Sequence, residues 1–364
     1  MIPSLNHSER LSMALRGLYQ TYGYRQYKVS QFEEYDLYAQ NRSFLIGEHI
    51  LSFSDINGQL LALKPDVTLS IIQNTRDDRR TRKLWYTENV YRVPRNAYGF
   101  QEILQTGLEC LGEIDLYTMA EVLMLAAQSL ETIRPEYVLD LSHIGILTGV
   151  FSHFEVPSSL SGEILDAIGE KNLHYLRELC AKGGLSEEAS SLLTSLCRLG
   201  GSADDAIPAL LALPLPEESR AAAQELQAVC SLLSVFGAYR VNLDLSVTND
   251  TDYYNGLIFR GFVDGVASPV LSGGRYDHLL HRMGKTGGAI GFAVYLSELE
   301  RLLAESREYD VDTLLIYDAD SDPLQVAETA KALTDAGQTV RVQPRGEAAI
   351  RFRRIIEPDG KEAD

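Results

Sequence analysis

The sequence predicts an α+β fold in which helices flank an antiparallel sheet, with an inserted helical domain and a short carboxy-terminal α/β unit. Strand-like runs bounded by turn residues fill the chain before about Pro157 and after Gly237. The Leu-, Ala- and Glu-rich stretch between them has the composition of helices. A strand–helix–strand pattern begins after Tyr309. We therefore expect a discontinuous sheet domain, an inserted helical domain and a final unit with a polar tail, over residues 1–156 with 238–306, residues 157–237, and residues 307–364.

Local patterns predict the individual elements in chain order. Leu11, Leu15 and Leu18 fall at helical spacing, which predicts a first helix over residues 8–19. Two further helices are predicted over residues 66–74 and 117–131. The predicted short strands are "YRQYKV", "GEHILSFSD", "QLLALKPD", "YRVNLDLSV", "YYNGLIFRGFV" and "ASPVLSG". The strand, helix and strand of the final unit are "VDTLLIYD", "DPLQVAETAKALTDAG" and "QTVRVQPR".

Charge and cysteine content narrow the class of protein. The net charge of −18 repels polyanions, which disfavours a nucleic-acid partner. No apolar run approaches the length of a membrane span, and the amino-terminal residues lack the pattern of a signal peptide. The cysteines form no CxxC pair and predict neither a zinc site nor a disulfide: Cys110, Cys180, Cys197 and Cys230. We expect a cytoplasmic protein without metal, cofactor or membrane contact.

The longest strand-like stretch, residues 86–113, reads as two strands joined by a loop that carries Arg92 and Arg95. Its second half, "QEILQTGLECLG", alternates in character, and successive strand residues face opposite sides. Leu104, Thr106, Leu108 and Cys110 share one face. The other face carries Gln105, Gly107 and Glu109, where the glycine lets a ligand approach the backbone. The spacing leaves two interpretations open, a ligand-binding face and a solvated outer face.

Three other segments carry polar groups whose local patterns have ordinary explanations. Asp66 and Thr68 follow a strand and fit a helix cap. The segment "TNDTDYYNG" places two tyrosines before an Asn-Gly turn and fits a hairpin. The segment "LSGGRYDHLL" places paired glycines before Arg275 and fits a tight turn. None of these segments specifies a site by itself.

Taken in order, these segments resemble the catalytic core of class II aminoacyl-tRNA synthetases, and histidyl-tRNA synthetase most closely. The resemblance runs from the amino terminus to about Leu303 and includes an inserted helical domain. The first signature motif resembles "TYGYRQYKVSQFEEYDLY", in which Ser30 takes the place of the family's usual proline. The segments that resemble the remaining motifs are "LALKPDVTLS", "TENVYRVPRNAYGFQEILQTGLECLGE", "TDYYNGLIF", "SGGRYDHLL" and "GAIGFAVYLSELERL". The resemblance implies an antiparallel sheet of the class II synthetase type.

The resemblance also implies that the chain keeps the groups with which the family holds histidine. Carboxylates suit the ammonium of an amino acid, and hydrogen-bonding side chains suit the two nitrogens of an imidazole. Arg92 remains to meet a carboxylate. The positions implied as histidine-binding are Asp66, Thr68, Arg92, Gln105, Glu109, Tyr253, Tyr254, Arg275 and Tyr276.

The positions that would handle ATP depart from the family pattern. Pro94 stands where the second motif has a glutamate that contacts ATP. Asn249 replaces the histidine-specific arginine, and Glu298 replaces the arginine that ends the third motif. Losing one such preorganised group typically costs about 10²–10³ in rate. We therefore expect no aminoacylation activity.

This combination resembles the regulatory subunit of ATP phosphoribosyltransferase, a family related to histidyl-tRNA synthetase. The resemblance implies a non-catalytic homodimer, within a hetero-oligomer, that activates a separate short catalytic subunit in the first step of histidine biosynthesis. It further implies feedback regulation by histidine and no tRNA partner, since the final unit is shorter than a complete anticodon-binding domain. Three alternatives stay open: a divergent histidyl-tRNA synthetase, a synthetase paralogue with another partner, and a pocket kept only as packed scaffold.

Overall fold

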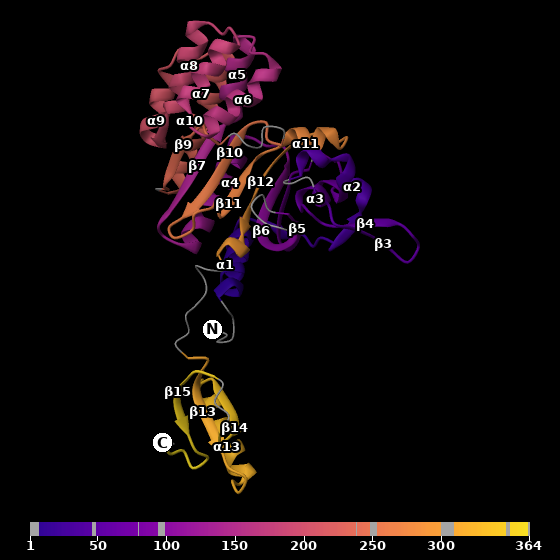
Figure 1. The fold of residues 1–364 in the computed structure, drawn as a ribbon, viewed down its shortest axis with the longest axis vertical. Coiled ribbons are helices and arrows are strands. Elements are labelled where there is room, and N and C mark those ends of the chain that lie inside the picture. The colour runs from indigo at the N-terminus through magenta and orange to yellow at the C-terminus, as the bar shows by residue number, and fades with distance from the viewer. Residues whose placement is uncertain are drawn as a thin grey trace. The chain divides into compact units, whose positions relative to one another are not determined.

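A computed structural model describes residues 7–45, 49–78, 80–93, 99–237, 239–247, 253–299, 309–346 and 350–362. The chain divides into two compact units, Met1–Leu303 and Ala304–Asp364. The first unit contains a large, mostly antiparallel sheet with helices packed on it (Figure 1), which confirms the predicted α+β class. Each unit is described separately below.

The large sheet has nine strands in the order β1-β5-β6-β12-β11-β10-β7-β9-β8. Neighbouring strands run antiparallel except in the pairs β1–β5 and β7–β9, which are parallel. The predicted hairpin in residues 86–113 is confirmed, because β5 and β6 pair continuously from Arg82↔Leu111 to Arg92↔Gln101. The strands are β1 (Arg25–Gln26), β5 (Arg82–Arg92), β6 (Gln101–Gly112), β7 (Tyr137–His143), β8 (Gly200–Ser202), β9 (Val241–Asp244), β10 (Leu257–Val263), β11 (Leu271–Arg275) and β12 (Gly288–Tyr295).

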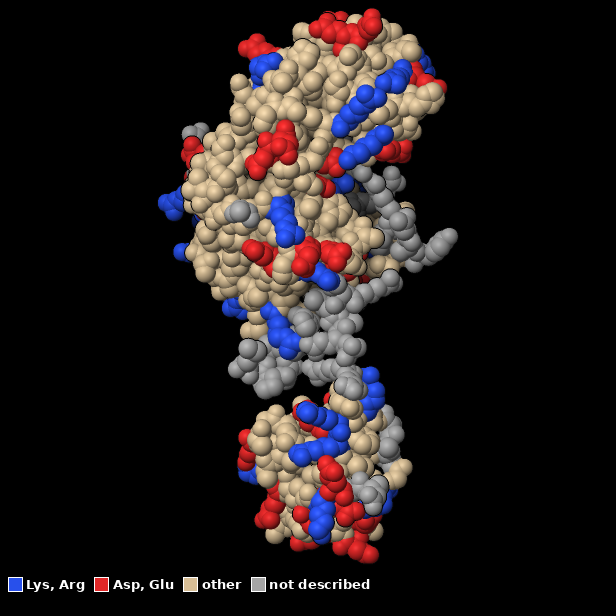
Figure 2. All heavy atoms as spheres, turned by 90° about the vertical axis from the view of Figure 1, so that its left-hand side faces the viewer, with Lys and Arg blue, Asp and Glu red and all other residues tan. Residues whose placement is uncertain are grey.

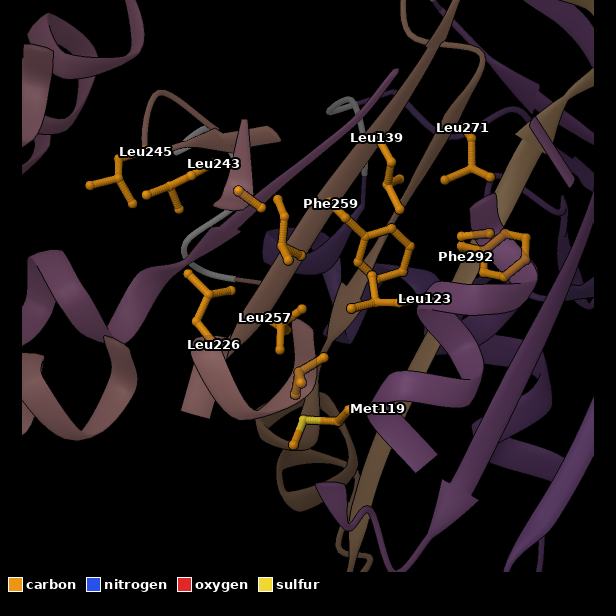
Figure 3. Packing of buried hydrophobic residues seen from close by; sticks show 14 of the residues in the cluster. Met119, Leu123, Leu139, Leu226, Leu243, Leu245, Leu257, Phe259, Leu271 and Phe292 are labelled. Carbon is orange, nitrogen blue, oxygen red and sulfur yellow. The ribbon is translucent and has the colours of Figure 1, made fainter. Parts of the chain in front are cut away.

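The main hydrophobic core lies between one face of this sheet and the helices α1 (His7–Thr21), α4 (Leu116–Ile133), α5 (Ile144–His153) and α10 (Glu217–Phe236). Met119 and Leu123 of α4 and Leu226 of α10 pack near Leu257 and Phe259 of β10 (Figure 3). Burying a side chain of this kind contributes about 1.5–3 kcal/mol. None of the described helices is both long and apolar enough to span a membrane.

Two of these helices were expected from the sequence, and the start of one is explained by its capping residue. The helix expected over residues 117–131 is α4, which begins directly after Asp115. The Asp115 side chain caps it by accepting a hydrogen bond from the Thr118 N–H at 2.8 Å. The helix expected over residues 8–19 is α1, with Leu11 and Leu15 buried on its core face.

The residues expected to form an inserted domain are mostly helical. Figure 1 shows helices α6 to α9 gathered at the end of the sheet where β7 and β9 lie. This segment also contains β8, which pairs with β9 at the edge of the large sheet, and its leucines join the main hydrophobic core. The boundaries of a separate domain at residues 157–237 therefore stay a prediction. The helices are α6 (Ser158–Gly169), α7 (Leu173–Lys182), α8 (Glu187–Arg198) and α9 (Ala203–Leu211).

The opposite face of the large sheet carries a second hydrophobic cluster and a small sheet of order β2-β4-β3. Tyr86, Leu111 and Ala289 of the large sheet contribute to this cluster, whereas their neighbours Trp85, Cys110 and Ile290 contribute to the main core. The alternation of strand side chains thus separates the two cores. The elements on this face are β2 (Phe32–Glu34), α2 (Tyr35–Gln40), η1 (Arg42–Phe44), β3 (Ser52–Ser54), β4 (Leu60–Leu63), α3 (Thr68–Asn74) and α11 (Asp277–Arg282).

The second unit is a parallel sheet of order β14-β13-β15 with one described helix. The expected strand–helix–strand pattern is confirmed as β13 (Val311–Tyr317), α13 (Pro323–Asp335) and β14 (Val340–Pro344). The residues expected to form a polar tail instead contain a further strand, β15 (Phe352–Ile356). Its apolar residues Phe352, Ile355 and Ile356 all lie opposite β13.

Candidate functional site

Glu109 of β6 is the centre of a buried polar cluster on the face of the large sheet that carries α3 and α11. The Thr68 hydroxyl donates a hydrogen bond to Glu109 Oε1 at 2.7 Å. The Tyr276 hydroxyl donates to Glu109 Oε2. Glu109 is only 3% exposed and Gln105 only 2%. Because both side chains are buried, this face of β6 is not a solvated outer face. That excludes one of the two interpretations that the spacing left open.

Glycines on neighbouring strands make room for this cluster. Gly291 of β12 lies opposite Glu109, and a Cβ atom added there would lie 1.8 Å from Glu109 Oε2. A Cβ atom at Gly274 would lie 2.6 Å from the Tyr254 ring, and one at Gly107 would lie 2.8 Å from the Tyr86 hydroxyl. The missing side chains let the carboxyl and the aromatic rings lie against the backbone of the sheet.

We expect Gly291→Ala to destabilise the protein by about 1–3 kcal/mol, because its methyl group overlaps the Glu109 carboxyl. Urea unfolding at constant pH measures the loss. Gly17→Ala is the matched control, since nothing lies within 4 Å of a Cβ atom at that helical position. The control should raise stability by about 1 kcal/mol. Equal stability of the Gly291→Ala variant and the parent would contradict this account of the site.

Asp66 and Arg92 form a buried ion pair beside Glu109. Arg92 Nη2 lies 3.4 Å from Asp66 Oδ2, and Arg92 Nε donates to the Pro65 carbonyl oxygen. Asp66 Oδ1 accepts a hydrogen bond from the Leu69 N–H at 2.9 Å. Of the two predicted capping residues, Asp66 therefore binds the first turn of α3, whereas Thr68 is the first residue of the helix and Val67 lies between them. Arg92 is the last residue of β5 and is 7% exposed, so its guanidinium neutralises Asp66.

Burial controls the charge of the two carboxyl groups. It raises the pKa of Glu109 to about 8, although the hydrogen bonds from Tyr276 and Thr68 oppose the shift. Burial also raises the pKa of Asp66 above its ordinary value, and the Arg92 guanidinium opposes that shift. At neutral pH Glu109 therefore holds a proton and can donate a hydrogen bond to a ligand.

Aromatic rings form one wall beside the cluster. The ring centroid of Tyr253 lies 4.7 Å from that of Tyr254 and 5.5 Å from that of Tyr276. Phe44 packs edge-on to Tyr253 at 6.2 Å. The sequence pattern did not single out Phe44 or Tyr86. Tyr86 could have been found by strand alternation, because it pairs with Gly107 in the register of the hairpin.

Gln105 completes the cluster at the end nearest Tyr295, its partner on β12. Its Oε1 atom is buried and has no hydrogen-bond partner among the described residues. Leaving a buried acceptor unpaired costs about 1–3 kcal/mol. A ligand with an N–H or ammonium group would remove this cost.

Arg275 does not join the group around Glu109. Its Nε atom donates to Asp277 Oδ2 at 2.8 Å, and its Nη1 atom lies 4.0 Å from the Met119 sulfur of α4. Strand alternation explains the difference from the expected set, since Tyr276 faces Glu109 and its neighbour points to the opposite side. The structure therefore brings together Asp66, Thr68, Arg92, Gln105, Glu109, Tyr253, Tyr254 and Tyr276.

Of the positions expected to have lost ATP-handling groups, one is described. Glu298 lies in η2 (Leu296–Leu299), where it is exposed and accepts a hydrogen bond from the Ser268 hydroxyl at 2.6 Å. Pro94 and Asn249 lie outside the described residues, as does Arg95.

The assembled groups suit a small polar ligand with a positive charge and a planar ring. Asp66, paired with Arg92, supplies carboxylate oxygens, and Glu109 supplies a protonated carboxyl. Gln105 supplies a buried amide oxygen that no described residue pairs with. The tyrosines supply an aromatic surface that can cover a planar ring. A free amino acid with a heteroaromatic side chain combines these features.

Comparison with known proteins relates the chain to one group of curated relatives. The ATP phosphoribosyltransferase regulatory subunit of Alkaliphilus metalliredigens (strain QYMF) is 27% identical over 331 residues. The match covers 88% of this chain and 84% of that protein.

Solved structures have the same fold. An ATP phosphoribosyltransferase regulatory subunit/histidyl-tRNA synthetase from Bacillus halodurans superposes with a TM-score of 0.80 at 23% identity, covering 96% of this chain and 93% of that chain. A chain of the ATP phosphoribosyl transferase (HisG:HisZ) complex from Thermotoga maritima gives a TM-score of 0.63 at 20% identity, covering 79% and 97%. These similarities establish the class II synthetase-like fold. A family model described as histidyl-tRNA synthetase matches residues 2–299, and the chain therefore belongs to the histidyl-tRNA synthetase family.

Proposed function

We propose that this chain is a non-catalytic regulatory subunit of ATP phosphoribosyltransferase, the enzyme of the first step of histidine biosynthesis. The observation that carries the proposal is the similarity to relatives of that name along most of the chain, 88% in the case above. Glu298 adds support, because an exposed carboxylate at the end of the third motif would repel a triphosphate. Chemistry on ATP is left to the separate, short catalytic subunit.

The ligand of the polar cluster is histidine or a histidine-like molecule. Asp66 and the buried amide oxygen of Gln105 suit its ammonium group, and the protonated Glu109 suits an imidazole nitrogen. Tyr253, Tyr254 and Tyr276 cover the ring. Feedback requires that histidine bind one assembly state more tightly than another, and the coupling is then reciprocal.

The protein acts in the cytoplasm as a homodimer within a hetero-oligomer and binds no tRNA. On the face of the molecule in Figure 2, Lys and Arg side chains occur in small groups among Asp and Glu side chains. This distribution supports a protein partner over a polyanion, in keeping with the net charge of −18. Residues 307–364, within the second unit, take the place of an anticodon-binding domain.

Reconstitution tests the proposal. The full chain, mixed with a short-form ATP phosphoribosyltransferase catalytic subunit from the same genome, should co-purify with it and raise its rate of condensing ATP with phosphoribosyl pyrophosphate. Calorimetry with free histidine should detect binding to the chain or to the complex, and Glu109→Ala, which removes the polar group, should weaken it by at least about tenfold. Absence of both co-purification and activation would refute the regulatory role. Absence of binding at millimolar histidine would refute the ligand alone.

A divergent histidyl-tRNA synthetase is the second candidate, because the family model covers residues 2–299. Histidine-dependent exchange of pyrophosphate into ATP separates the two candidates. We expect no exchange above background from the purified chain. Exchange at a rate adequate for translation would replace the regulatory role with a catalytic one.

A further inference from the structure

Lys285 binds the carboxy-terminal end of helix α3, the helix whose first residue, Thr68, belongs to the candidate site. Its ammonium donates hydrogen bonds to the carbonyl oxygens of Ile72 and Thr75, and it lies 3.4 Å from that of Gln73. These carbonyls lie in the last turn of α3 and at its C-cap residue, Thr75, where helical N–H groups run out. The Ile72 carbonyl also accepts the Thr75 N–H at 3.2 Å. A positive charge at this end of a helix is also favoured by its dipole.

The turn that follows helix α11 places Lys285 against α3. Helix α11 ends at Arg282, Gly284 follows its C-cap residue with φ 74°, and the Lys285 N–H then bonds back to the Leu280 carbonyl at 3.0 Å. The next residue, Thr286, donates from its N–H to Asp77 at 3.0 Å and from its hydroxyl at 2.9 Å. Two consecutive residues thus bind the segment that follows α3.

The two helices that meet at Lys285 also meet at Glu109. Helix α3 begins with Thr68, and Tyr276 directly precedes α11; both side chains donate to the Glu109 carboxyl. Helices α3 and α11 are therefore joined at both ends, by Glu109 at their amino-terminal ends and by Lys285 at their carboxy-terminal ends. Helix α3 has seven residues, too few to hold its position without such contacts.

We propose that Lys285 is a positioning residue for the ligand site, which holds α3 so that Thr68 and Asp66 stay in register with Glu109 and Tyr276. Lys285 touches none of the groups that face the ligand, and it acts through the backbone of α3. The part of the inference that names histidine as the ligand rests on the proposed function. The expected effects on α3 and on Glu109 do not depend on which ligand binds.

Lys285→Met tests the proposal in the full chain, since methionine keeps most of the aliphatic stem and removes the ammonium. We expect amide hydrogen exchange over residues 69–72 to accelerate at least about tenfold. We also expect the pKa of Glu109 to fall toward its ordinary value, because a loosened α3 admits water. Histidine affinity, where the parent chain binds histidine, should fall by about tenfold or more.

Lys331→Met is the matched control, because the Lys331 ammonium pairs with exposed Asp335 on α13. It should leave all three measurements unchanged. Asp77→Asn weakens the contact between Thr286 and the segment that follows α3. It should change amide exchange over residues 69–72 and the pKa of Glu109 in the same direction as Lys285→Met. This second variant keeps the proposal testable if Lys285→Met does not fold. Parental exchange over residues 69–72 together with a parental Glu109 pKa would overturn the proposal. Failure of the parent chain to bind histidine would instead count only against the proposed ligand.

Discussion

Glu109→Gln should make the protein markedly more stable than the parent at alkaline pH and leave it nearly unchanged at pH 5. Burial raises the pKa of Glu109 to about 8, from an ordinary value of 4.5. Between those two values the folded protein holds a proton that the unfolded chain releases, so the free energy of unfolding falls as pH rises. The fall is about 1.4 kcal/mol per pH unit, and it approaches roughly 5 kcal/mol in total by pH 8 before it levels off.

Glutamine removes this loss because its amide is neutral at every pH and keeps the shape of the protonated acid. Urea unfolding of parent and variant from pH 5 to pH 9 isolates Glu109, since all other titrating groups are common to both proteins. Glu102→Gln on the same strand is the control, because Glu102 is exposed and its loss should leave the pH dependence parental. A stability difference between parent and Glu109→Gln that stays constant with pH would show that Glu109 ionises normally.

The strands of the site were predictable because alternation is a local property. The pattern of "QEILQTGLECLG" places Gln105, Gly107 and Glu109 on one face, and the structure confirms that face. Burial of that face was not predictable, since it depends on α3 and α11, which come from distant parts of the sequence. The choice between a ligand face and a solvated face therefore needed the three-dimensional structure.

The expected site differs from the structure at two residues, Arg275 and Lys285. Arg275 was included as a position implied by the family resemblance, yet adjacent strand residues face opposite sides and its guanidinium meets Asp277 and Met119. Counting the alternation from Tyr276 would have excluded it. The role of Lys285 had no signal in the sequence, because its partners are backbone carbonyls that any residue supplies.

The fold was predictable for a different reason. Its order of helices and strands matches a family pattern, which fixes long-range pairing that local propensity cannot fix. Where the pattern ends, prediction became weaker. The residues of β15 were expected to lie in a polar tail, and Arg353 and Arg354 do stand among its apolar residues. Pairing with β13 identifies the segment as a strand.

Arg92→Met should destabilise the protein by about 3–5 kcal/mol, because it leaves the carboxylate of Asp66 buried without its counterion. The loss should be larger at pH 8 than at pH 5. Burial already raises the pKa of Asp66, and removal of the guanidinium raises it further. At low pH the carboxyl can take up a proton and avoid the cost, whereas at high pH it cannot.

A double-mutant cycle with Asp66→Asn measures the coupling directly. Asparagine can still accept the hydrogen bond from Leu69 that caps α3, but it carries no charge. Arg92→Met should therefore cost less in the Asp66→Asn background, and the pH dependence of its cost should disappear. Arg82 is the first residue of the same strand and forms a more exposed ion pair with Asp78. Arg82→Met should therefore lower the free energy of unfolding by no more than about 1 kcal/mol. Equal costs of Arg92→Met in the two backgrounds would show that Arg92 stabilises the site through Pro65 and packing, and that its charge does not set the ionisation of Asp66.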